Sequence, residues 1–338
     1  DVTGVQTCAL PIFNTKILRK SKFCFFMKKG KILFIDSTQS ELSIMLEEQG
    51  FICESFSNFS RDEYKKIVSG YVGIVIRSKV KLDEDFLQHC HGLKFIARVG
   101  AGMENIDVAY AEKCNIICLN APEGNRDAVG EQALGMILAL FNRIIVSDRE
   151  VREGKWIREG NRGIELGNKT VGIIGYGNTG SAFAKKLAGF GVKVISYDKY
   201  KTDYSDNYVL ESTMEKLFDE CDIVSLHTPL TDETQDLVNN DFLESFRKNI
   251  YIVNTSRGKI LNTADLVSAL DRGKVIGACL DVIEYEGLSF EDVNIPKEFK
   301  ELIKNNNVIL TPHIAGWTHE SNHKMALTIA RKIGELEL

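Results

Sequence analysis

The chain has 338 residues, of which 44% are hydrophobic and 26% are charged. These proportions are typical of a globular protein, and no apolar run approaches the roughly 20 residues that a membrane-spanning helix needs. The length exceeds what one hydrophobic core usually serves, so we expect two domains and no membrane insertion.

Residues 1–26 differ from the rest of the chain. Residues 2–12, VTGVQTCALPI, back-translate to a sequence that resembles a common short-read sequencing adapter. The apolar piece at 23–27 is shorter than the core of a signal peptide. We therefore expect 1–26 to be a non-native leader, made of adapter-like sequence and upstream read-through, and Met27 to be the natural start.

The charge and the cysteine content argue against a nucleic-acid-binding protein and against a metal-binding protein. Without the leader the chain has 38 basic and 46 acidic residues, a net charge of −8, and no basic stripe that would indicate a nucleic-acid partner. The six cysteines after Met27 form no CxxC pair and lie scattered in apolar segments, as buried reduced thiols do. We expect a cytoplasmic protein without a metal site.

From Met27 the chain alternates short β-branched runs with amphipathic stretches, the pattern of a parallel sheet covered by helices. The first series of expected strands is 31–35, 51–55, 73–76, 94–99 and 115–119, with helices at 41–49 and 83–90. A long helix follows at 125–147. The second series is 171–175, 193–197, 223–227, 251–254, 275–280 and 308–310. Six parallel strands fit a complete dinucleotide-binding domain.

The apolar spacing in 320–333 predicts a last helix. One helix cannot form a domain, so we expect it to pack on the first series. The expected domains are a discontinuous substrate domain, 27–125 plus 314–338, and a nucleotide-binding domain, 126–313.

A glycine turn follows the first strand of the second series. Gly175, Gly177 and Gly180 lie between this strand and a helical stretch at 179–190. Such glycines allow a tight turn, a close approach of pyrophosphate and tight helix packing. Asp198 ends the next strand, 23 residues after Gly175, where an acid accepts ribose hydroxyls and repels the 2′-phosphate of NADP.

We therefore expect NAD as cofactor. Lys199 and Lys201 lie nearby and weaken the exclusion of NADP. The alternative is a packing turn with an incidental surface aspartate.

Three polar residues, Arg257, Glu286 and His313, each follow an expected strand of the second series. Ligands of open α/β sheets bind at the carboxyl ends of the strands. Taken alone, each residue has a simpler interpretation: a surface cation, a solvated loop acid or a core histidine. Their common position after strands indicates a reaction site. Arginine offers a fixed fork of donors that suits a carboxylate, and histidine can give and take a proton near neutral pH.

Seven sequence blocks carry a resemblance to a known family. They are RVGAGMENID (98–107), NAPEGN (120–125), TVGIIGYGNTG (170–180), HTP (227–229), NTSRG (254–258), LDVIEYE (280–286) and TPH (311–313). In this order the chain resembles the D-isomer-specific 2-hydroxyacid dehydrogenases, and within them the phosphoglycerate dehydrogenases. The resemblance covers essentially all of 27–338. It implies an α/β fold in which a Rossmann NAD-binding domain is inserted into a flavodoxin-like substrate domain.

The resemblance also implies roles for individual residues. Arg257 would bind and polarise the 2-oxo acid, His313 would transfer the proton, and Glu286 would orient His313 and stabilise its protonated form. The implied cofactor-binding residues are Gly175, Gly177, Asn178, Thr179, Gly180, Asp198, His227, Thr228, Pro229, Thr255, Ser256, Asp281 and Gly316. The implied substrate-binding residues are Arg77, Arg98, Gly100, Ala101 and Gly102. In the alternative reading, Arg77 and Arg98 only pair with acids between the domains.

The implied activity is NAD-dependent interconversion of a D-2-hydroxy acid and its 2-oxo acid, with 3-phosphoglycerate as the leading substrate and hydroxypyruvate, glyoxylate or another 2-oxo acid as the alternative. The related formate dehydrogenases pair the histidine with glutamine, so Glu286 counts against that activity. An NAD(H)-sensing, co-repressor-like binding protein is the alternative from another class.

Further implications concern assembly and departures from the family. The helix at 125–147 resembles the family's dimer-forming arm, so we expect a homodimer. Gly287 and Trp317 depart from the family pattern at the rim of the pocket. Only 25 residues follow His313, so we expect the regulatory domain of some relatives to be absent.

Overall fold

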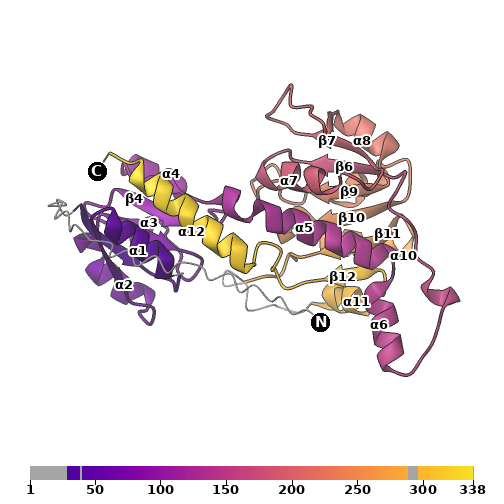
Figure 1. The fold of residues 1–338 in the computed structure, drawn as a ribbon, viewed down its shortest axis with the longest axis horizontal. Coiled ribbons are helices and arrows are strands. Elements are labelled where there is room, and N and C mark those ends of the chain that lie inside the picture. Colours follow the sequence, from indigo (N-terminus) through magenta and orange to yellow (C-terminus); the bar gives the residue numbers. More distant parts are fainter. Residues whose placement is uncertain (1–28, 39, 288–295, 338) are drawn as a thin grey trace, which may run out of the picture.

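The computed structural model describes residues 29–38, 40–287 and 296–337, and the expected leader, 1–26, lies outside these ranges. Two lobes lie side by side, each built on one parallel sheet, with the long helix α5 (Pro122–Phe141) beginning at their junction (Figure 1). Each sheet is covered by helices on both faces, so its strands are buried and read as continuous apolar runs.

The first lobe has a sheet in the order β2-β1-β3-β4-β5, which is the strand order of flavodoxin-like folds. Its strands are β1 (Gly30–Phe34), β2 (Phe51–Ser55), β3 (Gly73–Ile76), β4 (Phe95–Arg98) and β5 (Ile117–Leu119). Its helices are α1 (Ser40–Glu48), α2 (Arg61–Ile67), α3 (Glu84–Leu87), α4 (Val108–Lys113) and the last helix, α12 (His319–Gly334), with a 3-10 turn at Val68–Gly70.

The second lobe has a sheet in the order β12-β11-β10-β9-β6-β7-β8. The six strands from β8 to β11 follow the Rossmann order, with β6 as the first strand, and β12 is an additional strand at the edge. The strands are β6 (Thr170–Ile174), β7 (Lys193–Tyr197), β8 (Leu210–Glu211), β9 (Ile223–Leu226), β10 (Ile250–Asn254), β11 (Val275–Leu280) and β12 (Val308–Leu310). The helices are α5, α6 (Ile144–Arg152), α7 (Asn178–Lys186), α8 (Met214–Glu220), α9 (Asn240–Glu244), α10 (Thr263–Asp271) and α11 (Lys297–Lys304), with 3-10 turns at Glu159–Asn161 and Gly258–Ile260.

The prediction of one continuous helix at 125–147 is wrong. The structure has two helices, α5 and α6, bent by 60°, because Arg143 between them adopts a left-handed backbone with φ of 52°. The apolar spacing continues across the break, so periodicity alone does not reveal it. In the described part of the chain no single helix is long and apolar enough to cross a membrane, and α5 and α6 meet that length and composition only as this bent pair.

The last helix, α12, returns to the first lobe as expected (Figure 1). Met325, Ile329 and Ile333 of α12 are buried in one hydrophobic cluster with Ile32 of β1 and Phe95 of β4. The helix also packs along α5, so the segment between β12 and α12 runs from the second lobe back to the first.

Candidate active site

A cavity of about 670 Å³ lies between the lobes, where chain from both sheets converges. Clefts at the carboxyl ends of parallel strands are the usual ligand sites of such folds. Most of the sequence-predicted site residues line this cavity: Arg77, Arg98, Gly100, Ala101, Gly102, Gly177, Asn178, Thr179, His227, Thr228, Pro229, Thr255, Ser256, Arg257, Asp281, His313 and Gly316. Gly175, Gly180, Asp198 and Glu286 are not among the residues that line it.

The glycine turn has the local geometry that the sequence predicts. Gly175 has φ of +92°, a conformation that side-chain-bearing residues rarely adopt. A Cβ atom at Gly180 would lie 2.1 Å from the carbonyl oxygen of Gly175, so only glycine lets α7 start this close to β6. A Cβ atom at Gly177 would meet nothing within 4 Å. The N-terminus of α7 therefore has space for an anion beside it.

Asp198 is positioned behind this turn by three backbone donors. Its carboxylate accepts hydrogen bonds from the N–H groups of Tyr176 (2.8 Å), Tyr200 (3.0 Å) and Lys201 (3.1 Å). Lys199 pairs with Glu233 at 2.8 Å, and the Lys201 Nζ donates to the carbonyl of Tyr176. Both lysines are thus engaged elsewhere than at the Asp198 carboxylate.

The cavity wall beside the turn contains buried polar atoms that have no hydrogen-bond partner. The hydroxyl oxygens of Thr228 and Thr255 and the amide oxygen of Asn125 are buried without a hydrogen bond, which is unfavourable unless a ligand supplies one. His227 is buried and contacts Ser225 and Thr179, and burial lowers the pKa of His227 to about 3. A neutral wall with unpaired polar atoms, next to a free helix N-terminus, fits a dinucleotide.

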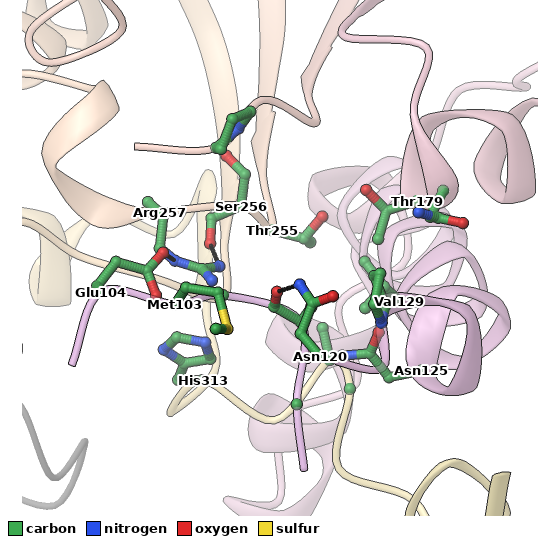
Figure 2. Close-up of a pocket in the computed structure, with 18 of the residues that line it drawn as sticks. Met103, Glu104, Asn120, Asn125, Val129, Thr179, Thr255, Ser256, Arg257 and His313 are labelled. Carbon is green, nitrogen blue, oxygen red and sulfur yellow. Dashed lines mark hydrogen bonds and ion pairs between the residues drawn. The ribbon is translucent and has the colours of Figure 1, made fainter. Parts of the chain in front are cut away.

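Arg257 follows β10 and points into the cavity from the second lobe. Its Nη1 donates to the carbonyl of Ser256 at 2.7 Å, and its Nε donates to Glu104 of the first lobe at 2.6 Å. Figure 2 shows Arg257 and Glu104 turned toward one another, with His313 nearby. A guanidinium held in this way presents a charged donor edge to an acid in the cleft.

His313 and Glu286 form the second half of the site. The His313 Nδ1 lies 2.7 Å from the Glu286 Oε2, and the other Glu286 oxygen accepts from the N–H of Ile283. Hydrogen bonding at Nδ1 fixes the imidazole ring and directs its Nε2 edge away from Glu286. The pair places a proton donor at the same cavity as Arg257.

Asp281 organises the loop that carries His313. Its buried carboxylate accepts from the Thr311 hydroxyl (2.5 Å) and from the N–H groups of Ile314 (2.9 Å) and Ala315 (2.8 Å). Its carbonyl accepts from the N–H of His313. Burial raises the pKa of Asp281, whereas these hydrogen bonds and His313 act in the opposite direction.

Two further arginines come from the first lobe. Arg98 is 9% exposed, its Nε donates to the carbonyl of Arg77, and no carboxylate of the described residues lies within 4.0 Å of it. Burial lowers the pKa of Arg98 to about 10, with Arg257 and Arg77 adding to this effect and Glu104 opposing it. The Arg77 guanidinium stacks 4.0 Å from the ring centre of Trp317. Burial also lowers the pKa of Arg77.

The loop 100–102 lies beside these arginines. The Asn120 amide donates to the carbonyl of Ala101 at 2.6 Å, and a Cβ atom at Gly102 would lie 1.9 Å from the Arg257 Nη2. Glycine at this position therefore lets Arg257 approach the backbone of the loop. The geometry is compatible with a carboxylate held between the loop and Arg257.

The cavity residues that were not predicted from the sequence include Glu104, Asn125 and Trp317. Glu104 and Asn125 lie inside the blocks RVGAGMENID and NAPEGN, so block membership alone was a usable signal. Trp317 was noted only as a departure from the family pattern. The described residues contain no group of three or more His, Cys, Asp or Glu side chains placed to hold a metal.

Comparison with known proteins gives the family. Residues 134–315 match the model of the D-isomer specific 2-hydroxyacid dehydrogenase NAD-binding domain. The chain is 35% identical to a hydroxypyruvate reductase of Thermotoga maritima over 309 residues, which cover 91% of this chain and 98% of that protein. It is 34% identical to a D-3-phosphoglycerate dehydrogenase of Archaeoglobus fulgidus, and the match covers 90% of this chain but only 56% of that protein.

Solved structures agree with this assignment. D-lactate dehydrogenase from Aquifex aeolicus, complexed with NAD and lactic acid, superposes with a TM-score of 0.76 at 26% identity, covering 90% of this chain and 94% of that one. The fold is therefore the two-domain α/β arrangement with a Rossmann unit, and residues 134–315 form an NAD-binding domain. The chain belongs to the family of D-isomer specific 2-hydroxyacid dehydrogenases.

Proposed function

We propose that the protein interconverts a D-2-hydroxy acid and its 2-oxo acid with NAD(H) as the redox partner. The observation that carries this proposal is the position of Arg257 and of the His313–Glu286 pair on one cavity beside a dinucleotide-binding turn. Bound NAD(H) supplies or accepts the hydride in this reaction. The residues of the chain bind the acid and move the proton.

In the reduction direction the substrate carboxylate lies against the loop 100–102 and the Arg257 guanidinium. Arg257 also donates to the ketone oxygen and stabilises the negative charge that develops there. His313 gives a proton to this oxygen, and Glu286 balances the charge of the imidazolium before transfer. In the oxidation direction His313 takes the proton back.

The wall opposite the reacting groups favours a substrate with a second anionic group. Arg98 is buried and forms no ion pair within the described ranges, although Glu104 and Asp36 act on it by charge. Arg77 lies beside it with its face on Trp317. Two adjacent cations, one buried and one half-buried, are stabilised when an anion binds between them. A phosphoglycerate-like acid satisfies this requirement, and hydroxypyruvate or glyoxylate, with one carboxylate, is the alternative.

The nucleotide half of the site favours NAD over NADP. Asp198 is fixed by three backbone N–H groups at the end of β7, where its charge opposes a 2′-phosphate. The proposed cofactor contacts are the thirteen residues named from the resemblance, of which Gly175, Gly180 and Asp198 act from behind the cavity wall. We propose the division into 27–125 plus 314–338 and 126–313 as the two domains. The first turn of α5 spans this boundary.

The exposed apolar side chains and the free cysteines support two further proposals, on assembly and on location. We propose a homodimer formed through the arm at α6, which carries exposed apolar side chains, and a cytoplasmic location. The six cysteines of the described residues are all free thiols, as is usual in a reducing compartment.

The test of the function is a panel of 2-oxo acids assayed with NADH and NADPH, on protein starting at Met27. The panel contains glyoxylate, pyruvate, hydroxypyruvate, 2-oxoglutarate and phosphohydroxypyruvate. We expect oxidation of NADH, with the highest kcat/KM for a substrate that has two anionic groups. Turnover of none of these acids would favour the NAD(H)-sensing binding protein. A higher kcat/KM with NADPH would overturn the role of Asp198.

A further inference from the structure

Glu104 contacts the arginine of the active site from the opposite lobe. Its Oε1 accepts from the Arg257 Nε at 2.6 Å, and 153 residues separate the two along the chain. The side chains are 34% and 23% exposed, so the ion pair is only partly screened by water. Among the described residues no other acid lies within 4.0 Å of Arg257.

The contact determines which edge of the guanidinium remains available. Nε is taken by Glu104 and Nη1 by the carbonyl of Ser256, and no hydrogen bond of Nη2 occurs within the described ranges. Nη2 and the second Glu104 oxygen, Oε2, both lie against Gly102, where a Cβ atom would be 1.9 Å and 2.1 Å away from them. Two fixed donors on a planar group orient the third, so Nη2 is directed at the loop 100–102.

The charge of Glu104 also offsets a concentration of positive charge. Burial raises the pKa of Glu104, but Arg257 by charge and hydrogen bond, together with Arg98, outweighs burial, and the net pKa lies below its usual value. Glu104 is therefore ionised throughout the neutral range. Without it, the repulsion between Arg257 and Arg98 across the cleft would be offset only by the smaller effect of Asp36 on Arg98.

We propose that Glu104 is a positioning residue: it holds Arg257 with one donor edge directed at the substrate carboxylate, and it touches neither substrate nor cofactor. An unrestrained arginine has many rotamers and loses this freedom on every binding event. Fixing the guanidinium in advance therefore increases both the affinity for the acid and the rate of the reaction. The inference rests on the proposed function of Arg257.

The test compares Glu104→Ala and Glu104→Gln with Glu123→Gln as the matched control. Glu123 forms an ion pair with Lys332 at 2.9 Å, and it contacts neither Arg257 nor the cavity. For the best 2-oxo acid we expect kcat to fall at least tenfold in Glu104→Ala. The Glu104→Gln variant lies between wild type and Glu104→Ala, because its amide oxygen still accepts from Nε. We expect Glu123→Gln to match wild type and the Kd for NADH to stay within twofold in all variants.

A double-mutant cycle separates positioning from a general structural effect. If Glu104 acts through Arg257, adding Glu104→Ala to Arg257→Ala causes no further loss of kcat. Additive losses, unchanged kcat in Glu104→Ala, or a higher kcat/KM from release of a competing carboxylate would each overturn the proposal.

Binding of oxamate to the NADH complex, followed by fluorescence, provides a readout without turnover. We expect the Kd for oxamate to rise at least tenfold in Glu104→Ala and to be unchanged in Glu123→Gln. Wild-type protein that binds oxamate but reduces no 2-oxo acid would contradict the proposed function alone. An unchanged Kd in Glu104→Ala would contradict the role of Glu104 alone.

Discussion

His313 has an unusual backbone for a side-chain-bearing residue, with φ of 54°. Such a conformation is unfavourable for residues other than glycine and persists where the surroundings enforce it. Asp281 does so by accepting from the N–H groups of His313, Ile314 and Ala315. The residue that we propose for proton transfer is thus held in place through its backbone by a buried acid.

The pair His313–Glu286 yields a prediction at the residue scale. His313→Gln removes the proton donor, and we expect kcat to fall by about 100-fold or more, as loss of an acid–base group usually causes. Glu286→Gln should cause a smaller loss, because an amide oxygen can still orient Nδ1 but cannot balance the imidazolium charge. Steady-state kinetics with NADH measures both. A His313→Gln variant with wild-type kcat would remove His313 from the mechanism.

His227 yields a prediction about acid stability. Burial lowers the pKa of His227 to about 3, whereas histidine in an unfolded chain has a pKa of about 6.5. Between these values the unfolded chain binds a proton that the folded protein excludes, so the free energy of unfolding falls as the pH decreases below about 6.5. From pH 7 to pH 5 this group alone accounts for roughly 2 kcal/mol.

Urea unfolding of wild type and His227→Asn at both pH values isolates this contribution. We expect wild type to lose about 2 kcal/mol more than the variant between pH 7 and pH 5. Equal losses would show that His227 is protonated in the folded protein. His323, exposed and paired with Glu41, offers the control His323→Asn, for which we expect no comparable difference.

Individual residues differ in how well sequence predicts them. Arg257, Glu286 and His313 were predictable because each follows a strand of one parallel sheet, and the carboxyl ends of such strands meet at one edge. Glu104 could not be predicted in this way, because its partner lies 153 residues away in the sequence. The local pattern of 98–107 does not indicate which side chain reaches across the cleft. The stacking of Arg77 on Trp317 also joins residues that are far apart in the sequence, although both belong to the proposed substrate domain.

At the scale of elements, burial explains which predictions succeeded. The strand β3 has four buried residues, GIVI, and parallel strands covered on both faces read as such runs. The strand β8 was missed because it has two residues and Leu210 is 53% exposed, so no apolar run marks it. The break between α5 and α6 was missed because a single left-handed residue, Arg143, changes the direction without interrupting the apolar spacing.

The segment between β12 and α12 yields a prediction at this scale. It carries His313 and Trp317, and the turn is closed by the Trp317 N–H donating to the carbonyl of Ile314. Trp317 therefore couples the loop of His313 to Arg77 of the first lobe. A cation–π contact contributes about 1 kcal/mol, which is roughly a fivefold effect on binding. Trp317→Ser should thus raise KM about fivefold for 2-oxo acids with a second anionic group.

The comparison substrate is glyoxylate, which has one carboxylate and needs no contact with Arg77. We expect its KM to stay within twofold in Trp317→Ser, and Trp317→Phe to retain most of the effect because a ring face remains. Equal changes for both classes of substrate would show that Trp317 acts on the His313 loop and has no role in orienting Arg77.

At the scale of the whole molecule, two lobes share one site and neither contains it alone. Arg257, His313 and the nucleotide turn come from the second lobe, whereas Glu104, Arg98 and the loop 100–102 come from the first. The ion pair Arg257–Glu104 crosses the cleft, and the segment that carries His313 also carries Trp317, which stacks on Arg77 of the first lobe. Any relative movement of the lobes therefore changes the site directly, which is a requirement for admitting a substrate and then excluding water.

The arm formed by α6 and the segment after it yields the last prediction. Because of the bend at Arg143, α6 points away from the second lobe (Figure 1). Large apolar side chains on the arm are exposed: Ile144, Ile145, Val151, Trp156, Ile157 and Ile164. Trp156 is 81% exposed, and several large exposed apolar side chains on one short segment indicate a protein contact. A second copy of the chain would cover both arms in a symmetric dimer.

Light scattering should give twice the mass of one chain for wild type and the mass of one chain for Trp156→Glu combined with Ile145→Glu, because an unpaired charge is costly in an apolar interface. Leu327→Glu is the matched control, since Leu327 is exposed on α12 and away from the arm, and we expect it to remain dimeric. The reacting groups of each copy all come from one chain, so the monomeric variant should keep a kcat within a few-fold of wild type. A wild-type monomer, or a dimer that both arm substitutions leave intact, would show that the exposed apolar side chains of the arm serve another purpose.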